Sequence, residues 1–200
     1  MREIKVAATQ MACSINTDEN VDKAIELITK ASKEGANIIL IQELFGNVYF
    51  CKDQKDQYFD LAMPFDGHPI LNTMSKVAKE NNVVLPISYF EKSNKAYFNS
   101  VAIINADGSI LGNYRKSHIP DGPGYQEKFY FNPGDTGFKV WDTSFAKIGV
   151  GICWDQWSSE AARIMSLQGA EVIFYPTAIG GEPDSEDDYD SSDMWQRAMI

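Results

Sequence analysis

The chain alternates short apolar runs with longer segments of helical periodicity, and this alternation limits the fold more than any other feature of the sequence. Each apolar run is short for a helix and is bounded by polar residues or turn signals, as strands are. The dipeptide Asp107-Gly108 separates two of the runs and is a strong hairpin signal. The expected strands are Ile4–Gln10, Asn37–Gln42, Val83–Phe90, Phe98–Asn105, Ser109–Arg115, Ala146–Cys153 and Glu171–Tyr175. Strands that alternate with helices pack as a mixed sheet covered by helices, so we predict an α/β layered fold.

Three segments between these strands have the features of helices. Thr17 is a favourable N-cap ahead of two acidic residues, and Gly35 lies just beyond the expected end of that helix. Apolar residues recur at helical spacing in Leu71–Asn81. Ser158 or Ser159 can cap a third helix.

The composition of the chain indicates its cellular compartment and disfavours some classes of binding partner. The chain has 200 residues, of which 44% are hydrophobic and 23% are charged, as in an ordinary globular protein. No apolar run approaches the ~18–20 residues that span a bilayer, and the N-terminus lacks a signal-peptide core. Three scattered cysteines favour free thiols in a reducing compartment, and a formal charge of −10 disfavours nucleic acid and anionic membranes. We therefore predict a soluble cytoplasmic protein with neither a nucleic-acid nor a membrane partner.

Cys153 is the strongest single candidate for a catalytic residue. It ends the run Ala146–Cys153 and precedes a short turn into the third helix. A nucleophile on a tight strand-to-helix turn is exposed, and nearby main-chain N–H groups can face an oxyanion. The helix N-terminus and a nearby cation would favour the thiolate form. From this segment alone, a buried and inert cysteine is an equally good interpretation.

Two other strands also end at ionisable residues. Glu43 follows the run Asn37–Gln42, and a carboxylate there could accept a proton from a thiol. Lys116 follows Ser109–Arg115, and an ammonium there could stabilise an oxyanion. Taken singly, each is better interpreted as an ordinary solvated residue at a strand end. Taken with Cys153, they supply a base, an electrostatic stabiliser and a nucleophile at three strand ends, which indicates one shared pocket.

The segments around these residues resemble the catalytic segments of the nitrilase superfamily, whose members use a Glu–Lys–Cys triad. The matching segments are Ile41-Gln42-Glu43-Leu44, Tyr114-Arg115-Lys116-Ser117-His118 and Gly151-Ile152-Cys153-Trp154-Asp155. The resemblance implies a four-layer α-β-β-α sandwich assembled into homo-oligomers. It implies hydrolysis through a covalent thioester on Cys153, with no metal and no organic cofactor. It also matches Glu127 to a second active-site glutamate that many members carry.

The resemblance is strongest to the members that hydrolyse N-carbamoylputrescine, a cationic carbamoyl amine. Segments 45–51, 116–128 and 153–157 carry it. It implies that the products are putrescine, ammonia and carbon dioxide. We expect Tyr49, Trp154, Ala178 and Glu182 to contact the substrate, with Glu182 binding its distal ammonium.

We interpret residues 1–200 as a single carbon–nitrogen hydrolase domain. Members of the superfamily continue for several more strands and helices beyond the point where this chain stops, so we expect a truncated C-terminus. Three alternatives stay open: a sibling enzyme acting on another amide, ureide or nitrile, a non-catalytic binding module, and a simple thiol-bearing α/β domain. A Cys–His–acid triad is disfavoured because His68 lies in a Gly67–Pro69 loop with no visible orienting partner, and His118 is close in sequence to the proposed Lys116. A zinc site from Cys51, Cys153 and the two histidines is disfavoured because the ligand-pair spacing is absent.

Overall fold

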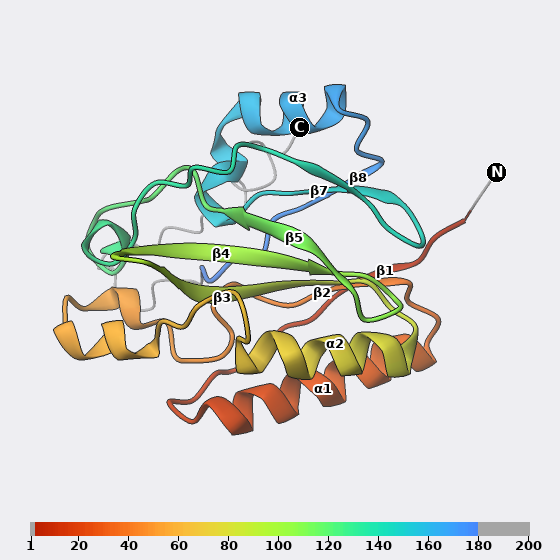
Figure 1. The fold of residues 1–200 in the computed structure, drawn as a ribbon, viewed down its shortest axis with the longest axis horizontal. Helices are drawn as coiled ribbons and strands as arrows, with labels where there is room; N and C mark the ends of the chain where they lie inside the picture. The colour runs from red at the N-terminus through yellow and green to blue at the C-terminus, as the bar shows by residue number, and fades with distance from the viewer. Residues whose placement is uncertain (1–2, 180–200) are drawn as a thin grey trace, which may run out of the picture.

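The computed structural model describes residues 3–179 and has helices on both outer sides of two inner groups of strands (Figure 1). α1 (Thr17–Lys33) and α2 (Pro69–Asn81) cover one side, and α3 (Ser159–Leu167) covers the other. The predicted α-β-β-α sandwich is therefore confirmed. No helix within residues 3–179 is both long enough and apolar enough to cross a membrane.

Within the described part of the chain, eight strands form the inner layers. They are β1 (Val6–Ala8), β2 (Ile38–Leu40), β3 (Leu85–Ser93), β4 (Ala96–Ile104), β5 (Ile110–Arg115), β6 (Val140–Asp142), β7 (Lys147–Val150) and β8 (Val172–Phe174). β3, β4 and β5 form an antiparallel sheet in that order, and β1 pairs in parallel with β2. A single β-bridge between Ile38 of β2 and Val84, the residue just before β3, joins the two-stranded sheet to the β3–β5 sheet. β7 lies between β6 and β8, antiparallel to the first and parallel to the second.

Short 3₁₀-helices occupy several of the connections. They are η1 (Phe50–Lys52), η2 (Asp56–Leu61), η3 (Glu127–Phe129) and η4 (Cys153–Trp157). The sequence did not indicate these elements, because a single 3₁₀ turn has no apolar periodicity of its own. Two of them carry residues of the candidate site.

The ends of α1 follow the physical rules for caps, with one correction to the prediction. Asn16, and not Thr17, is the N-cap: its side-chain oxygen accepts hydrogen bonds from the main-chain N–H groups of Asp18 and Glu19. Gly35 has a φ of 90° just beyond the helix, so the predicted C-terminal glycine is confirmed.

Two apolar cores fill the spaces between the layers. The first lies between the helices and the first sheet, and it includes the four buried residues of α2: Leu71, Met74, Val77 and Ala78. The second lies between the β3–β5 sheet and the β6–β8 sheet, where side chains from β4 and β5 meet those of β7 and β8. Burial on both faces makes the β3–β5 sheet a rigid support for residues at its end.

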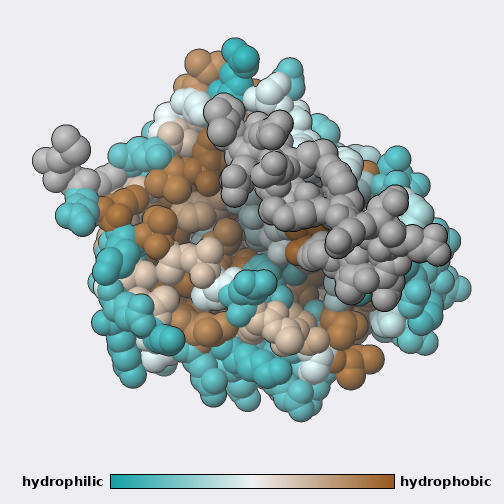
Figure 2. All heavy atoms as spheres, turned by 180° about the vertical axis from the view of Figure 1, so that it is seen from behind, coloured by the Kyte–Doolittle hydropathy of each residue, from teal (hydrophilic) through white to brown (hydrophobic). Residues whose placement is uncertain are grey.

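The N-terminal strand differs from the expectation. The run Ile4–Gln10 was expected to be a buried strand, but only Val6–Ala8 is regular and Val6 is 46% exposed. Within residues 3–179, β1 pairs with β2 alone, so one of its edges has no neighbouring strand there. Apolar side chains also gather on the molecular surface that Figure 2 shows from behind.

Candidate active site

Lys116 lies at the centre of a cluster of buried charges. It follows β5, its side chain is fully buried, and its main-chain N–H donates to the carbonyl of Asn99 on β4. Its Nζ donates to Oε1 of Glu43 at 2.8 Å and to Oε2 of Glu127 at 2.7 Å. Burial alone would lower the pKa of Lys116, but the two carboxylates hold that pKa above its ordinary value. The ammonium is therefore charged at neutral pH and fixed between two acids.

Gly134 secures the strand end that presents Lys116. Its N–H donates to the Lys116 carbonyl at 2.8 Å. A Cβ at position 134 would overlap the main-chain carbonyl of Arg115, so a larger residue cannot pack there without moving the strand end.

Glu43 is held on a sharp turn just beyond β2. The next residue, Leu44, has a left-handed φ of 52°, and its N–H donates to the hydroxyl of Ser88 on β3. Besides Lys116, Oε1 of Glu43 accepts a hydrogen bond from Nδ2 of Asn99 at 2.7 Å. Oε2 accepts one from the main-chain N–H of Ala178 at 2.9 Å. The carboxylate is thus oriented by donors on three sides and buried from solvent.

Glu127 is the second acid of the cluster and lies on η3. Its Oε1 accepts a hydrogen bond from the Tyr49 hydroxyl at 2.7 Å, while Oε2 faces Lys116. Burial, followed by repulsion from Glu43, raises the pKa of Glu127 to about 7. Two acids share one ammonium here, so the cluster takes up a proton near neutral pH.

Cys153 is the first residue of η4 and has a strained backbone conformation, as catalytic nucleophiles on tight turns often do. Its φ is 41°, which is rare for a residue with a side chain, and it is 5% exposed. Burial and then the charge of Glu43 raise the pKa of the Cys153 thiol, and the opposing effect of Lys116 is smaller. The expectation that the local field would favour a thiolate is therefore wrong. The resting residue is a neutral thiol, which needs a base before it can attack.

Asp155 ties the nucleophile turn to the strand end that carries Lys116. It is fully buried, and its Oδ2 accepts hydrogen bonds from the Tyr114 hydroxyl at 2.7 Å and the Ile152 N–H at 2.9 Å. Its Oδ1 accepts one from the His118 N–H at 2.9 Å and lies 2.7 Å from that residue's Nδ1. One carboxylate therefore bridges residues on both sides of Lys116 and the residue just before Cys153.

The remaining predicted site residues have separate outcomes. Tyr49 contacts Glu127, and Ala178 contacts Glu43 through its N–H. Trp154 is 44% exposed, and its N–H makes no hydrogen bond with any residue in 3–179, as is usual at the first turn of a helix. Glu182 lies outside the described residues. His118 faces Asp155, which gives it no place in a triad with Cys153.

Sequence reasoning missed Asn99 and Asp155. Asn99 and Ser100 interrupt the apolar residues of β4 and are fully buried, so polar side chains in a core strand were an available signal. Asp155 lies two positions after the nucleophile and gave no such signal, because its partners come from distant segments.

Known proteins match the chain over nearly its whole length. The profile of the family described as "Carbon-nitrogen hydrolase" matches residues 5–199. This chain belongs to the carbon–nitrogen hydrolase family. An N-carbamoylputrescine amidase from Solanum tuberosum is 62% identical to this chain over 198 residues, which are 99% of this chain and 66% of the relative. A citrullinase from Francisella tularensis subsp. tularensis is 57% identical over 199 residues, which are 100% of this chain and 69% of the relative. The chain thus spans about two thirds of the length of these curated relatives.

A solved structure also resembles the chain. A carbon–nitrogen hydrolase from Helicobacter pylori G27 matches it with a TM-score of 0.89 and 41% identity, covering 98% of this chain and 67% of that one. An amidase from Nesterenkonia matches with a TM-score of 0.78 at 20% identity, a likeness of fold alone.

Proposed function

We propose that the chain hydrolyses the ureido group of N-carbamoylputrescine and releases putrescine, ammonia and carbon dioxide. One observation carries the proposal. Glu43, Lys116 and Glu127 form a buried charged cluster, and the charges of all three act on the pKa of the Cys153 thiol. Such a cluster is costly to bury, and strongly perturbed groups concentrate at functional sites.

The first half of the reaction forms a covalent intermediate. Glu43 accepts the proton of the Cys153 thiol as sulfur attacks the carbamoyl carbon, because a thiol with a raised pKa does not ionise unaided. The carbonyl oxygen becomes an oxyanion, which the Lys116 ammonium and the main-chain N–H of Trp154 stabilise. Glu43 then returns the proton to the departing nitrogen, and the carbon–nitrogen bond breaks to leave a thioester on Cys153.

The second half regenerates the enzyme. Glu43 accepts a proton from water, and the hydroxide attacks the thioester carbon. The carbon–sulfur bond breaks and the thiol recovers its proton. The carbamic acid released in this step decomposes to carbon dioxide and the remaining nitrogen product. Glu127 holds Lys116 in place through both halves by its hydrogen bond to Nζ.

The names of the relatives support a ureido substrate. N-carbamoylputrescine amidases at 62% identity and a citrullinase at 57% identity are named for substrates that both end in a ureido group. The two substrates differ at the opposite end, where one carries an amine and the other an α-amino acid. We propose that Glu182 binds the amine of N-carbamoylputrescine, as its place after β8 in the sequence favours.

Hydrolysis of citrulline is the second candidate, because the citrullinase aligns with the whole chain.

A third proposal concerns the oligomeric state and the cellular compartment. Family resemblance favours a homo-oligomer, and the composition favours the cytoplasm.

Release of ammonia from N-carbamoylputrescine and from citrulline, measured side by side with Cys153→Ala as the control, tests the two substrate proposals and the mechanism. We expect turnover of the first substrate, little of the second, and none by the variant. Preference for citrulline would transfer the assignment to that ureide. Equal rates for the chain and Cys153→Ala would overturn the mechanism.

The proposed role of Glu182 has its own test. Glu182→Gln should raise KM for N-carbamoylputrescine far more than KM for N-propylurea, which lacks the amine, because only the first substrate loses a charge contact. Equal effects on both substrates would reject the assignment.

A further inference from the structure

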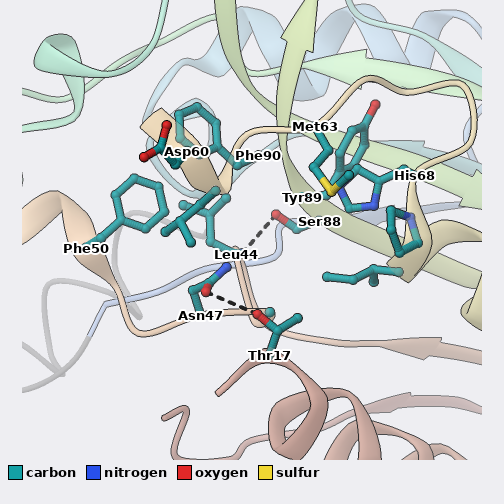
Figure 3. A pocket seen from close by; sticks show the side chains of 14 residues that line it. Thr17, Leu44, Asn47, Phe50, Asp60, Met63, His68, Ser88, Tyr89 and Phe90 are labelled. Atoms are coloured by element: carbon teal, nitrogen blue, oxygen red, sulfur yellow. Dashed lines mark hydrogen bonds between the residues drawn. The ribbon is translucent and has the colours of Figure 1, made fainter. Parts of the chain in front are cut away.

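A cavity lies beside the turn that follows Glu43. Its volume is about 230 Å³, and its wall comes from the segment after β2, from η2, from the start of α2 and from β3 (Figure 3). Most of its wall is apolar or aromatic. The principal apolar side chains are Phe50, Leu61, Met63, Ile70, Tyr89 and Phe90. A cavity of this character is typical of a small-molecule site.

Two polar groups in the wall are buried and incompletely paired. His68 is 4% exposed, and its Nδ1 is buried without a hydrogen-bond partner among residues 3–179. Its ring meets that of Tyr89 edge-on, with centroids 4.9 Å apart. Ser88 is fully buried, and its oxygen accepts the Leu44 N–H at 2.9 Å, which leaves its own O–H available as a donor. A buried polar group without a partner costs free energy, so a ligand that pairs with it gains affinity.

The charge of the wall selects the kind of ligand. Burial lowers the pKa of His68 to about 4, more than Glu91 raises it, so the imidazole is neutral at pH 7. Among the described residues that line the cavity, Asp60 alone carries a formal charge, and it is exposed. An anion would meet only repulsion there, and a cation would lose its hydration against apolar walls.

The cavity shares its wall with the catalytic turn. Leu44 lines it, and the hydrogen bond from Leu44 to Ser88 fixes the main chain immediately after Glu43 (Figure 3). A ligand that contacts Ser88 or displaces Leu44 therefore acts on the residue next to the proposed base.

We propose that this cavity is a second ligand site, which binds a compact neutral molecule with an apolar body and one hydroxyl or amide group paired with His68. Occupancy changes the reactivity of Cys153 through the turn at Leu44. The binding part is independent of the proposed catalytic activity, whereas the coupling part rests on the proposed role of Glu43.

Two probes that differ by one polar group test the binding. Benzyl alcohol carries a hydroxyl on an aromatic body, and toluene lacks it. Titration of the ¹⁵N-labelled chain with benzyl alcohol should shift the His68 imidazole resonances to saturation. One hydrogen bond to a buried unpaired group should make benzyl alcohol bind about 5- to 10-fold more tightly than toluene. Absence of a saturable shift at His68, or equal affinities for the two probes, would overturn the proposal.

Two variants locate the site. Leu61→Trp fills the cavity from η2 and should abolish binding of both probes, whereas Leu111→Trp adds the same side chain on β5, outside the cavity, and should leave binding unchanged. His68→Phe keeps a ring but removes the nitrogens, so the two probes should then bind within twofold of each other. Binding that survives Leu61→Trp, or a probe preference that survives His68→Phe, would assign the effect to another place.

The coupling is measured without substrate, through the rate at which iodoacetamide alkylates Cys153. Saturating benzyl alcohol should change this rate at least about twofold in the parent and not in Leu61→Trp, since an ion pair moved by even a fraction of an ångström changes proton transfer. An unchanged rate with His68 saturated would reject the coupling and leave the binding site. Failure of the proposed hydrolysis, in contrast, would not alter the shifts of His68.

Discussion

Arg115 and Lys116 are adjacent cations at the end of β5, and their side chains enter opposite faces of the sheet, as neighbours beyond a strand do. Arg115 joins the buried Glu91 by two of its nitrogens and the exposed Asp135 by a third, and it lies 4.0 Å from the centre of the Phe98 ring. Its side chain remains 16% exposed. All three guanidinium nitrogens of Arg115 therefore have a hydrogen-bond acceptor, and the group lies near the molecular surface.

Lys116 enters the opposite face and is completely buried. It meets Glu43 and Glu127, and its charge also acts on the thiol of Cys153. Burial, and then the negative charge of Glu43, raise the pKa of Glu127 to about 7. Arg115 therefore stabilises a fold, whereas Lys116 holds a cluster that gains and loses protons near neutral pH.

The difference shows that a buried ion pair does not by itself indicate a catalytic site. Arg115 has an ion pair with a buried acid as well, and it is fully satisfied. What distinguishes Lys116 is that it and both of its acids are completely buried beside a reactive thiol, whereas one of the two acids that pair with Arg115 is exposed. Substitutions in the two networks test whether this difference governs function.

The largest effect should come from removing the nucleophile. Cys153→Ala should lower turnover by about 10,000-fold or more, because the covalent route is lost. Cys13→Ala is the matched control, since Cys13 lies outside the charged cluster and should retain turnover. Ammonia release and the melting temperature, measured on both variants, separate chemistry from folding. Comparable losses in the two variants would contradict the assignment.

The two cations themselves give the next largest effect. Lys116→Met should lower turnover by about 1,000-fold, because the oxyanion loses its charged partner. Arg115→Met should instead lower the free energy of unfolding by about 3 kcal/mol, because Glu91 is left buried without its cation. Turnover by the folded fraction of Arg115→Met should change less than about threefold. Denaturant unfolding and initial rates on both variants make the measurement, and an equal loss of turnover would erase the distinction between the two faces.

The sequence was sufficient for the elements that depend on local patterns. The buried face of α2, the hairpin at Asp107-Gly108 and the strand ends that carry Glu43, Lys116 and Cys153 all follow from periodicity or turn chemistry. Strand ends converge at one rim in a layered fold, so residues placed there by sequence come together in space.

The properties that depend on burial and on long-range contacts were beyond the sequence. The contact of Asn99 with Glu43 spans 56 positions, and that of Asp155 with Tyr114 spans 41. The pKa shift of Cys153 was predicted in the wrong direction. Its main cause is the loss of solvation, which depends on the residues that surround the thiol in the folded chain. The cap at Asn16 was missed by one residue, which is the usual uncertainty of a helix boundary.

Asp155 should have an intermediate effect, because it positions the reacting groups without touching them. Asp155→Asn replaces one acceptor oxygen by a donor that faces other donors, so the turn before Cys153 should shift and turnover should fall roughly 10- to 100-fold. The control is Glu91→Gln, which alters the other buried carboxylate network and should affect unfolding more than turnover. Alkylation rates of Cys153 across pH should change in Asp155→Asn alone, and the same profile in both variants would reduce Asp155 to a structural residue.

Tyr49 should have the smallest effect, and its direction tests the balance of charge around Lys116. The Tyr49 hydroxyl donates to Glu127 and so favours the ionised acid. Tyr49→Phe removes this donor, and the pKa of Glu127 should rise from its value of about 7. Activity falls at low pH as the acids take up a proton, so the acidic limb of the rate profile should move to higher pH by about one pH unit. Tyr97→Phe is the control, because the Tyr97 ring packs against Phe59 outside the cluster, and it should leave the limb in place. An acidic limb that stays in place in Tyr49→Phe as well would mean that turnover does not need the ionised form of Glu127.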